Sequence, residues 1–583
     1  MNDRSQSFNK RLSQLIREIY PELDSNILSS LVVEAFWPEG SSPRKRGRLL
    51  GNSLWSEKDA MLITYGNSII DGEHKPLDLL HDFLLNNLKG TISNVHILPF
   101  FPYTSDDGFA VTDFRSVNTQ LGSWADINRI AADFTLMSDL VLNHVSSQGA
   151  WFNDYRQGKA PYDKFFFEAS PDEDLSEVVR PRTTPLLQEV DTPNGPRHVW
   201  CTFSHDQIDL DFRNPEVLLE FLRIIRLHVD NGVKTIRLDA VAFLWKEIGT
   251  NCIHLPQTHA VVQLMRLLCD YATEKIILLT ETNVPKAENL SYFGNGNEAH
   301  AIYNFPLPPL ILHAMMSGSA KYLRRWQKAM PPAPLGCAYF NFTASHDGIG
   351  MRPAEGVLPP EEKDRVIETI KALGGLVSMR TLPDGSQSPY EINTTFYDAM
   401  SQTFNGPDQN HFERFICSQT IVMSLEGMPA FYIHSMLATP NDYEQVEFRG
   451  MNRGINRHRW DYPALRGLLA DPETPQAQVM EELSARLKCR AKQRAFHPNA
   501  TQLTVNIGDE RIFGLWRQSL DRRQSIFALH NVSAEHIYLN TEDLNLIEDE
   551  HWVDALSGDV IDLGTEAITL APYQCRWITN RAG

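Results

Sequence analysis

The 583-residue sequence has no long hydrophobic run. A membrane-spanning helix needs about 18 or more consecutive apolar residues, so no such helix is predicted and a membrane is not expected as a partner. Residues 1–23 have the polar spacing of an amphipathic helix, and they lack the apolar segment and small-residue cleavage site of a secretory signal. We therefore expect a cytoplasmic protein.

Cysteine is also scarce, with seven residues in all and no pair at CxxC spacing. An odd number of scattered cysteines argues against a disulfide framework and a zinc site, and it fits a reducing compartment. No loop of dedicated metal ligands stands out either, so we expect no metal and no bound cofactor. The seven are Cys201, Cys252, Cys269, Cys337, Cys417, Cys489 and Cys575.

Positive charge is in deficit as well. The chain has 54 Lys and Arg against 73 Asp and Glu, a formal net charge of −19, which argues against nucleic acid as a partner. An apolar content of 42% with 10% aromatic residues is typical of a soluble globular protein. The length suggests two to four domains, or one large barrel with additions.

Eight strand-like runs alternate with helical stretches such as 215–232, which ends at a glycine. This alternation predicts an α/β fold with a parallel sheet, and the number of strands alone does not exclude a doubly wound sheet. Polar residues at the carboxyl ends of several runs favour a (β/α)8 TIM barrel, whose active site lies at that face. The runs are 61–66, 92–100, 136–144, 234–241, 275–283, 301–305, 338–347 and 428–435.

Two gaps, after the third and seventh strands, are about 60 and roughly 80 residues long and are therefore predicted to be insertions, not plain loops. Short alternating runs from residue 498 onward predict an appended antiparallel β-domain. The predicted organisation is an N-terminal helical segment (1–58), the catalytic barrel (59–143, 208–347 and 403–497), insertion domains B (144–207) and B′ (348–402), and a C-terminal β-domain (498–583).

Three carboxylates fall at predicted strand ends: Asp239, Glu281 and Asp347, on the fourth, fifth and seventh strands. His144 and His346 accompany them. Carboxylates brought close together raise each other's pKa, which keeps one of them protonated as an acid near neutral pH. A nucleophilic carboxylate beside an acid/base carboxyl is the arrangement of a retaining glycosidase.

Arg237 lies two residues before Asp239, so both side chains point to the same face of the strand. Taken alone, Arg237 and Asp239 could equally form an ion pair with a purely structural role. The same Asp, Glu and His residues could build a divalent-metal site, an alternative that chemistry alone leaves open. Arg237 counts against it, because a fixed cation competes with a metal and suits an Asp239 held ionised as a nucleophile.

Four segments resemble the signature regions of the α-amylase family of glycoside hydrolases, in the same order: DLVLNH (139–144), IRLDAV (236–241), LTET (279–282) and SHDG (345–348). The resemblance implies that Asp239 is the nucleophile and Glu281 the general acid/base. It further implies that Asp347 binds sugar hydroxyls in the transition state, helped by His144, Arg237 and His346.

Other segments are similar to the sucrose phosphorylase subgroup of that family: 96–114, 207–216, 340–351 and 452–460. By this resemblance Asp106 pairs with Arg453 and closes the site behind one glucosyl unit. Phe109 is expected to pack on the sugar face, and Gln207 to belong to the sugar site. The DDGF sequence around Asp106 could otherwise be a simple turn.

Inorganic phosphate, the co-substrate that this resemblance implies, needs cationic and hydrogen-bonding groups beside the carboxylates. In the sucrose phosphorylases the second arginine of an RPR-like motif and a tyrosine before QVN or QIN hold phosphate. The matching positions are Arg182 in RPR (180–182) and Tyr390 in PYEIN (389–393).

Glu391 stands where sucrose phosphorylases have Gln, and we expect its carboxylate to change the acceptor that fits. The segments 29–39, 245–259, 280–300 and 388–393, and with them nearly the whole chain, resemble the glucosylglycerate phosphorylases. This resemblance implies glucosylglycerate and phosphate as small-molecule partners, and Arg182 or Arg453 would bind the glycerate carboxylate. Glucosylglycerol or sucrose phosphorylase, and more distantly a hydrolase or transglucosylase, are alternatives. A binding protein with an inactive site is disfavoured because all three carboxylates are kept. A monomer or a homodimer is expected.

Overall fold

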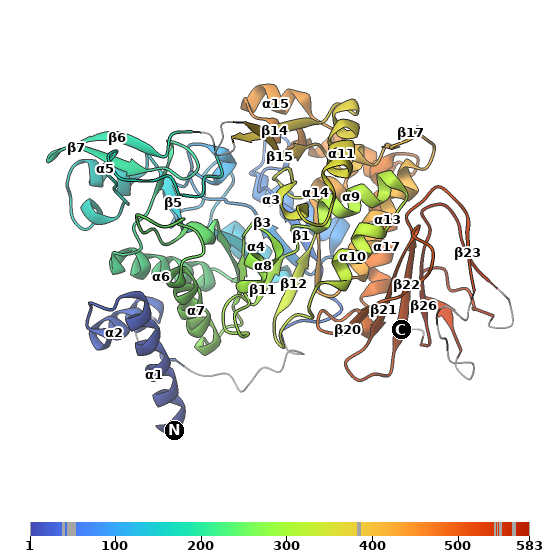
Figure 1. The fold of residues 1–583 in the computed structure, drawn as a ribbon, viewed down its shortest axis with the longest axis horizontal. Coiled ribbons are helices and arrows are strands. Elements are labelled where there is room, and N and C mark those ends of the chain that lie inside the picture. The colour runs from blue at the N-terminus through green and yellow to red at the C-terminus, as the bar shows by residue number, and fades with distance from the viewer. Residues whose placement is uncertain are drawn as a thin grey trace.

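Eight parallel strands close into a barrel at the centre of the molecule, which confirms the predicted fold class (Figure 1). The computed structural model describes residues 2–37, 41–43, 54–182, 184–381, 386–540, 544, 546, 551–562 and 567–581. Each of the eight predicted runs overlaps one barrel strand. In order around the barrel the strands are β1 (Met61–Thr64), β18 (Met428–Tyr432), β12 (Ala338–Asn341), β11 (Ala301–Tyr303), β10 (Ile277–Thr280), β9 (Val233–Asp239), β4 (Thr135–Val141) and β3 (Asn94–Ile97).

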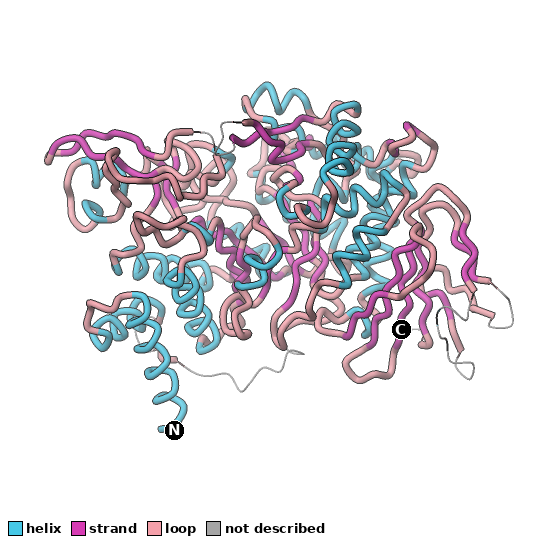
Figure 2. The backbone as a smooth tube through the Cα atoms, viewed as in Figure 1, coloured by secondary structure: helices cyan, strands magenta, loops and turns pink. Residues whose placement is uncertain are grey.

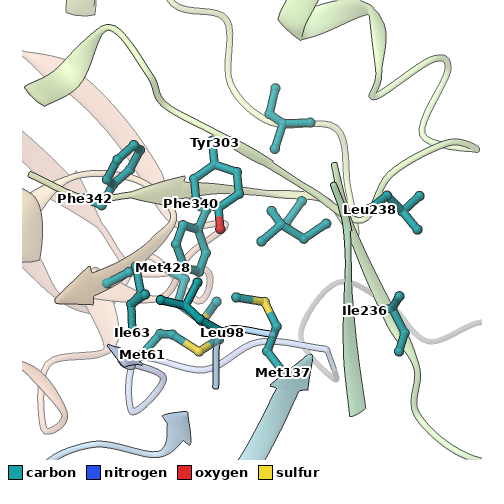
Figure 3. Packing of buried hydrophobic residues seen from close by; sticks show 14 of the residues in the cluster. Met61, Ile63, Leu98, Met137, Ile236, Leu238, Tyr303, Phe340, Phe342 and Met428 are labelled. Atoms are coloured by element: carbon teal, nitrogen blue, oxygen red, sulfur yellow. The ribbon is translucent and has the colours of Figure 1, made fainter. Parts of the chain in front are cut away.

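The two faces of each barrel strand have different neighbours. Met137 and Tyr303 point into the barrel, whereas Ile236 and Leu238 extend from the opposite side of β9 (Figure 3). Both sets are buried, because helices cover the outside of the barrel. The alternation of a strand therefore turns Arg237 and Asp239 inward, toward the axis.

Helices surround the strands, as the backbone trace shows (Figure 2). Several begin with proline in their first turn, where its missing N–H costs no hydrogen bond, among them α6 and α7. The barrel helices are α3 (Pro76–Phe83), α4 (Trp124–Asp133), α6 (Pro215–Asp230), α7 (Pro256–Tyr271), α8 (Lys286–Ser291), α9 (Leu307–Ser317), α10 (Lys321–Lys328), α13 (His411–Ser424), α14 (Ile433–Met436), α15 (Tyr443–Arg449), α16 (Tyr462–Ala470) and α17 (Pro475–Arg490).

The N-terminal segment adds two helices to the outside of the barrel, α1 (Asn2–Ile19) and α2 (Ser25–Phe36). Helix α1 packs against α7 and α2 against α6. The ring of Phe8 lies 4.7 Å from that of Tyr271, and both are buried. The predicted amphipathic helix is thus present, with its apolar face on the barrel.

The connections after β4 and β12 carry small sheets of their own. After β4 the chain forms β5 (His144–Ser146), α5 (Ala150–Arg156), β6 (Leu187–Thr192), β7 (Gly195–Trp200) and β8 (Gln207–Asp209), with β5 paired to β8 and β6 to β7. After β12 it forms β13 (Ile349–Gly350), α11 (Pro360–Ala372), β14 (Leu376–Thr381), β15 (Gln387–Asn393), α12 (Phe396–Ala399), β16 (Gln402–Thr403) and β17 (Gly406–Pro407). The order β13-β15-β14 makes a three-stranded sheet, which lies beside α15 in Figure 1. The domain boundaries given above stay a prediction.

The C-terminal part is antiparallel, as expected. Its main sheet has the order β20-β21-β22-β26-β24, and β23 pairs with β25 outside it. The strands are β20 (Thr501–Thr504), β21 (Ile512–Gln518), β22 (Ser525–Asn531), β23 (Ile537–Leu539), β24 (Val553–Asp554), β25 (Ile568–Leu570) and β26 (Cys575–Thr579); β2 (Ile69–Ile70) and β19 (Trp460–Asp461) pair separately. No helix in the described ranges is long and apolar enough to cross a membrane.

Candidate active site

A cavity of about 770 Å³ opens at the carboxyl ends of the barrel strands. Its walls come from the ends of β9 and β10 and from the connections that follow β4 and β12. Twelve of the thirteen residues predicted for the site line it, so residues from distant parts of the chain converge as the sequence indicated. They are Asp106, Phe109, His144, Arg182, Gln207, Arg237, Asp239, Glu281, His346, Asp347, Tyr390 and Arg453.

Arg237 and Asp239 form an ion pair at the base of this cavity, with Arg237 Nη1 2.7 Å from Asp239 Oδ1. Arg237 also donates to Asp139 on the neighbouring strand β4, and its Nε donates to the Tyr303 hydroxyl at 3.2 Å. Asp139 is fully buried and contacts His96 Nε2 at 2.7 Å. Sequence reasoning missed Asp139; its signal is a charged residue inside the apolar run 136–142.

Glu281 follows β10 directly and lies beside Asp239. Its Oε2 accepts the backbone N–H of Ala240 at 3.1 Å, and Ala240 has the left-handed backbone angle φ of 51°. Burial raises the pKa of Asp239 well above its ordinary value; Arg237 opposes this and the Glu281 carboxylate adds to it. Burial also raises the pKa of Glu281. Two neighbouring carboxyls with raised pKa values share protons as a pair.

Arg453, on the 3₁₀ turn η7 (Asn452–Asn456), joins two carboxylates. Its Nη1 lies 2.5 Å from Asp347 Oδ1, and its Nε and Nη2 donate to Glu391 at 3.0 and 2.7 Å. Burial alone would raise the pKa of Asp347, yet Arg453 and His346 hold this pKa well below its usual range. Asp347 is therefore ionised throughout the physiological pH range.

This arrangement corrects the predicted place of Glu391. Glu391 is only 3% exposed and is not among the residues that line the cavity in the described part of the chain. A bidentate pair with Arg453 holds its carboxylate behind the wall. The structure thus places the Glu391 carboxylate against Arg453 and not on the cavity surface; that it changes which acceptor fits stays a prediction.

The predicted ion pair between Asp106 and Arg453 is wrong. Among the described residues, Asp106 pairs with Arg457, at 3.9 Å. Its neighbour Asp107, with φ of 48°, pairs with Arg449 and, at 2.6 Å, with Arg457. Arg453 is held instead by its two carboxylates. Asp106 still lines the cavity, fixed there through the turn η3 (Asp106–Gly108).

Phe109, His144, Gln207 and His346 form one compact wall. The rings of Phe109 and His346 stack at 4.9 Å with an interplanar angle of 7°. His144 Nε2 and Gln207 Nε2 both contact the Phe109 carbonyl, at 3.0 and 3.3 Å. Burial lowers the pKa of His144, and lowers that of His346 to about 3. Both imidazoles are therefore neutral and can donate or accept hydrogen bonds without adding charge.

The outer wall of the cavity is rich in arginine. Arg182 lies with its guanidinium 5.6 Å from the ring centroid of Tyr390, which brings the two predicted phosphate-binding residues together. Arg180, Arg352 and Arg380 line the same cavity and were missed. Arg352 and Arg380 carry no local motif, and only the pairing of β13 and β14 with β15 places them beside Tyr390.

Within the described ranges, no group of three or more His, Cys, Asp or Glu residues is placed to hold a metal ion. At the base of the cavity the guanidinium of Arg237 lies between two of the carboxylates. The expectation that no metal or cofactor is needed stays a prediction.

Residues 85–347 match the model "Alpha amylase, catalytic domain", which places this barrel with its three carboxylates in the α-amylase class of carbohydrate-active enzymes. A glucosylglycerate phosphorylase of Spirochaeta thermophila is 44% identical over 530 residues, 89% of this chain and 90% of that protein. One of Allomeiothermus silvanus is 46% identical, covering 90% and 92%. The crystal structure of sucrose 6F-phosphate phosphorylase from Thermoanaerobacter thermosaccharolyticum superposes with a TM-score of 0.70 at 25% identity, covering 82% and 94%. The chain belongs to the α-amylase family, glycoside hydrolase family 13, in its branch of glycoside phosphorylases.

Proposed function

We propose that this enzyme is a retaining α-glucoside phosphorylase that converts 2-O-α-glucosylglycerate and phosphate to α-glucose 1-phosphate and glycerate. The observation that carries this proposal is the single cavity in which Asp239, Glu281 and Asp347 meet the pair Arg182 and Tyr390. The carboxylates suit the breaking of a glycosidic bond, and the arginine and tyrosine suit an oxyanion acceptor.

In the first step Asp239 attacks the anomeric carbon while the bond from that carbon to the aglycone oxygen breaks. Glu281 gives its proton to the departing oxygen. Arg237, 2.7 Å from Asp239, favours the ionised form of the nucleophile, so the proton of the pair resides on Glu281. The product of this step is a β-glucosyl ester of Asp239.

In the second step a phosphate oxygen attacks the same carbon from the side that the aglycone left. The ester bond to Asp239 breaks, and the proton of hydrogen phosphate returns to Glu281. Asp347 stays ionised in both steps and stabilises positive charge at the anomeric carbon. Two inversions give net retention of the α configuration.

The choice of glycerate rests on the glucosylglycerate phosphorylases that are 44% and 46% identical over most of the chain. The anionic acid fits the arginines of the outer wall. Glucosylglycerol and sucrose keep the same chemistry with a neutral aglycone, and they are the competing substrates. Cytoplasmic location, and action as a monomer or homodimer on small molecules alone, complete the proposal.

The test is release of glucose 1-phosphate from glucosylglycerate, glucosylglycerol and sucrose in parallel, with and without phosphate. We expect phosphate-dependent release from glucosylglycerate, with the two neutral glucosides much slower. Preference for a neutral glucoside would keep the chemistry and overturn the acceptor. Free glucose formed equally well without phosphate would identify a hydrolase, and it would remove the roles given to Arg182 and Tyr390.

A further inference from the structure

The six arginines that line the cavity differ in how well their charges are compensated. Arg237 and Arg453 are each paired with two carboxylates. Arg380 donates to Glu355 at 3.2 Å.

Arg180, Arg182 and Arg352 make no ion pair with any carboxylate in the part of the chain that the structure describes. Arg180 donates to the Thr184 carbonyl, and Arg182 lies against Tyr390 as the proposed phosphate ligand, which leaves Arg352. In a protein with a net charge of −19, an uncompensated cation that faces a cavity is a candidate anion site.

The neighbours of Arg352 place it on the side of the site where the aglycone lies. Glu281, the proposed acid, marks where the aglycone oxygen lies, and Asn283 follows it by two residues and lines the same cavity. A Cβ atom on Gly350 would lie 2.9 Å from Asn283 Nδ2, so the end of β13 is in close contact with Asn283. Arg352 comes two residues after Gly350 and starts the turn η6 (Arg352–Ala354).

Two further contacts fix this placement. The backbone N–H of Met351 donates to the Tyr390 carbonyl at 3.1 Å, which ties the Arg352 turn to the strand of the proposed phosphate-binding tyrosine. The charge of Arg352 contributes to the lowered pKa of His254, whose main cause is burial, and His254 contacts Glu288 on α8. Arg352 therefore lies between β15 and the connection that follows β10.

Asn283 supplies a second polar group at the same place. Its Oδ1 is buried and has no hydrogen-bond partner among the described residues. A buried amide oxygen without a partner is unfavourable, and a bound hydroxyl group would satisfy it. A guanidinium and a free amide on the wall of the same cavity match an aglycone that carries both a carboxylate and hydroxyl groups.

We infer that Arg352 binds the carboxylate of the acidic aglycone and that Asn283 binds one of its hydroxyl groups. This inference rests on the proposed function and replaces Arg182 and Arg453 as the carboxylate ligands. Arg182 is left to the phosphate, with Tyr390. The enzyme would thus select an anionic over a neutral aglycone through a residue of the turn η6, which follows β13.

The experiment compares Arg352→Gln with the parent enzyme on glucosylglycerate and on glucosylglycerol, which has CH₂OH in place of the carboxylate. At saturating phosphate we expect kcat/KM for glucosylglycerate to fall about 30-fold or more, as for a buried charge pair that loses one member. Turnover of glucosylglycerol should stay within about threefold, and it also reports that the variant is folded. Arg365→Gln, on α11 of the same connection and away from the cavity, should change neither.

Three results would each overturn the inference. They are an equal loss of kcat/KM on both glucosides, a rise in the KM for phosphate by the same factor, and no change in kcat/KM on either glucoside. Asn283→Ala should lower kcat/KM for both glucosides, because both present hydroxyl groups. Failure of the proposed function is separately visible: the parent enzyme itself would then prefer glucosylglycerol or sucrose, and the role of Arg352 would fall with it. A parent that prefers glucosylglycerate and a variant that keeps this preference would contradict the inference alone.

Discussion

At the scale of single residues, the chemistry depends on the two carboxylates that Arg237 contacts. Arg237 Nη1 donates to both Asp139 and Asp239, so the proposed nucleophile shares this donor with a second carboxylate. Burial meanwhile raises the pKa values of both Asp239 and Glu281. The carboxyls of Asp239 and Glu281 therefore share a proton, and the Arg237 cation lies nearer to Asp239.

Glu281→Gln removes the proton that the leaving group needs. We expect kcat on glucosylglycerate to fall by about 10²–10⁴, the usual contribution of general acid catalysis. α-Glucosyl fluoride, whose fluoride leaves without a proton, should form the glucosyl enzyme with a much smaller loss. Burst kinetics on both substrates would check this, and equal losses on the two would assign another residue as the acid.

The pH dependence follows from the same group. A raised pKa keeps Glu281 protonated above the range of an ordinary carboxyl, and activity is lost when the pH rises through that raised value. We expect an alkaline limb in the kcat/KM profile on glucosylglycerate that is absent in Glu281→Gln. A limb that persists in the variant would belong to another titrating group.

At the scale of elements, the small sheet β13-β15-β14 sets the outer half of the site. It carries Tyr390 toward the cavity and Glu391 toward Arg453, because adjacent residues of β15 face opposite sides. Its contact with η7 then connects Arg453 to Asp347. The sheet β13-β15-β14 holds Arg453 in place and does not present a carboxylate to the substrate.

Glu391→Gln tests this arrangement. The variant leaves Arg453 buried with one carboxylate in place of two, so we expect kcat/KM for glucosylglycerate to fall by about ten- to a hundredfold. Sucrose activity should not rise, because residue 391 does not face the acceptor. Glu361→Gln on the exposed side of α11 is the matched control. A gain of sucrose activity would restore Glu391 as an acceptor-contacting residue.

Much of this architecture could be predicted from local sequence. The eight strands and the positions of Asp239 and Glu281 follow from period-two alternation and from polar residues at strand ends. The ion-pair partners of the arginines in residues 449–457 could not be predicted from local sequence. Arg449, Arg453 and Arg457 recur every four residues, and only the packing of η7 against β15 decides that Arg453 meets Asp347 while the other two meet Asp107.

At the scale of the whole molecule, one buried acid affects stability far from the cavity. Glu426, between α13 and β18, accepts the N–H of Ala333 at 2.8 Å. Burial raises its pKa from 4.5 to about 7. The folded state thus binds a proton more tightly than the unfolded state, and stability declines as the pH rises from about 4.5 past 7.

Glu426→Gln should remove this decline while keeping the oxygen that accepts from Ala333. We expect the variant to gain up to about 3 kcal/mol over the parent between pH 5 and pH 8. Urea unfolding at the two pH values measures it, with Glu481→Gln on the exposed face of α17 as the control. A difference between parent and variant that does not change with pH would show that Glu426 keeps its ordinary pKa.

The pairing of β1 with β18 has a consequence for biosynthesis. The strand that closes the barrel spans residues 428–432, and Arg453 follows it, so more than three-quarters of the chain must leave the ribosome before Asp347 meets its partner. Until then the growing sheet has two open edges, at β1 and at β12, which are prone to pairing with other chains. An unfinished chain therefore has no complete site, and its two sheet edges stay open until about three-quarters of the chain has been made.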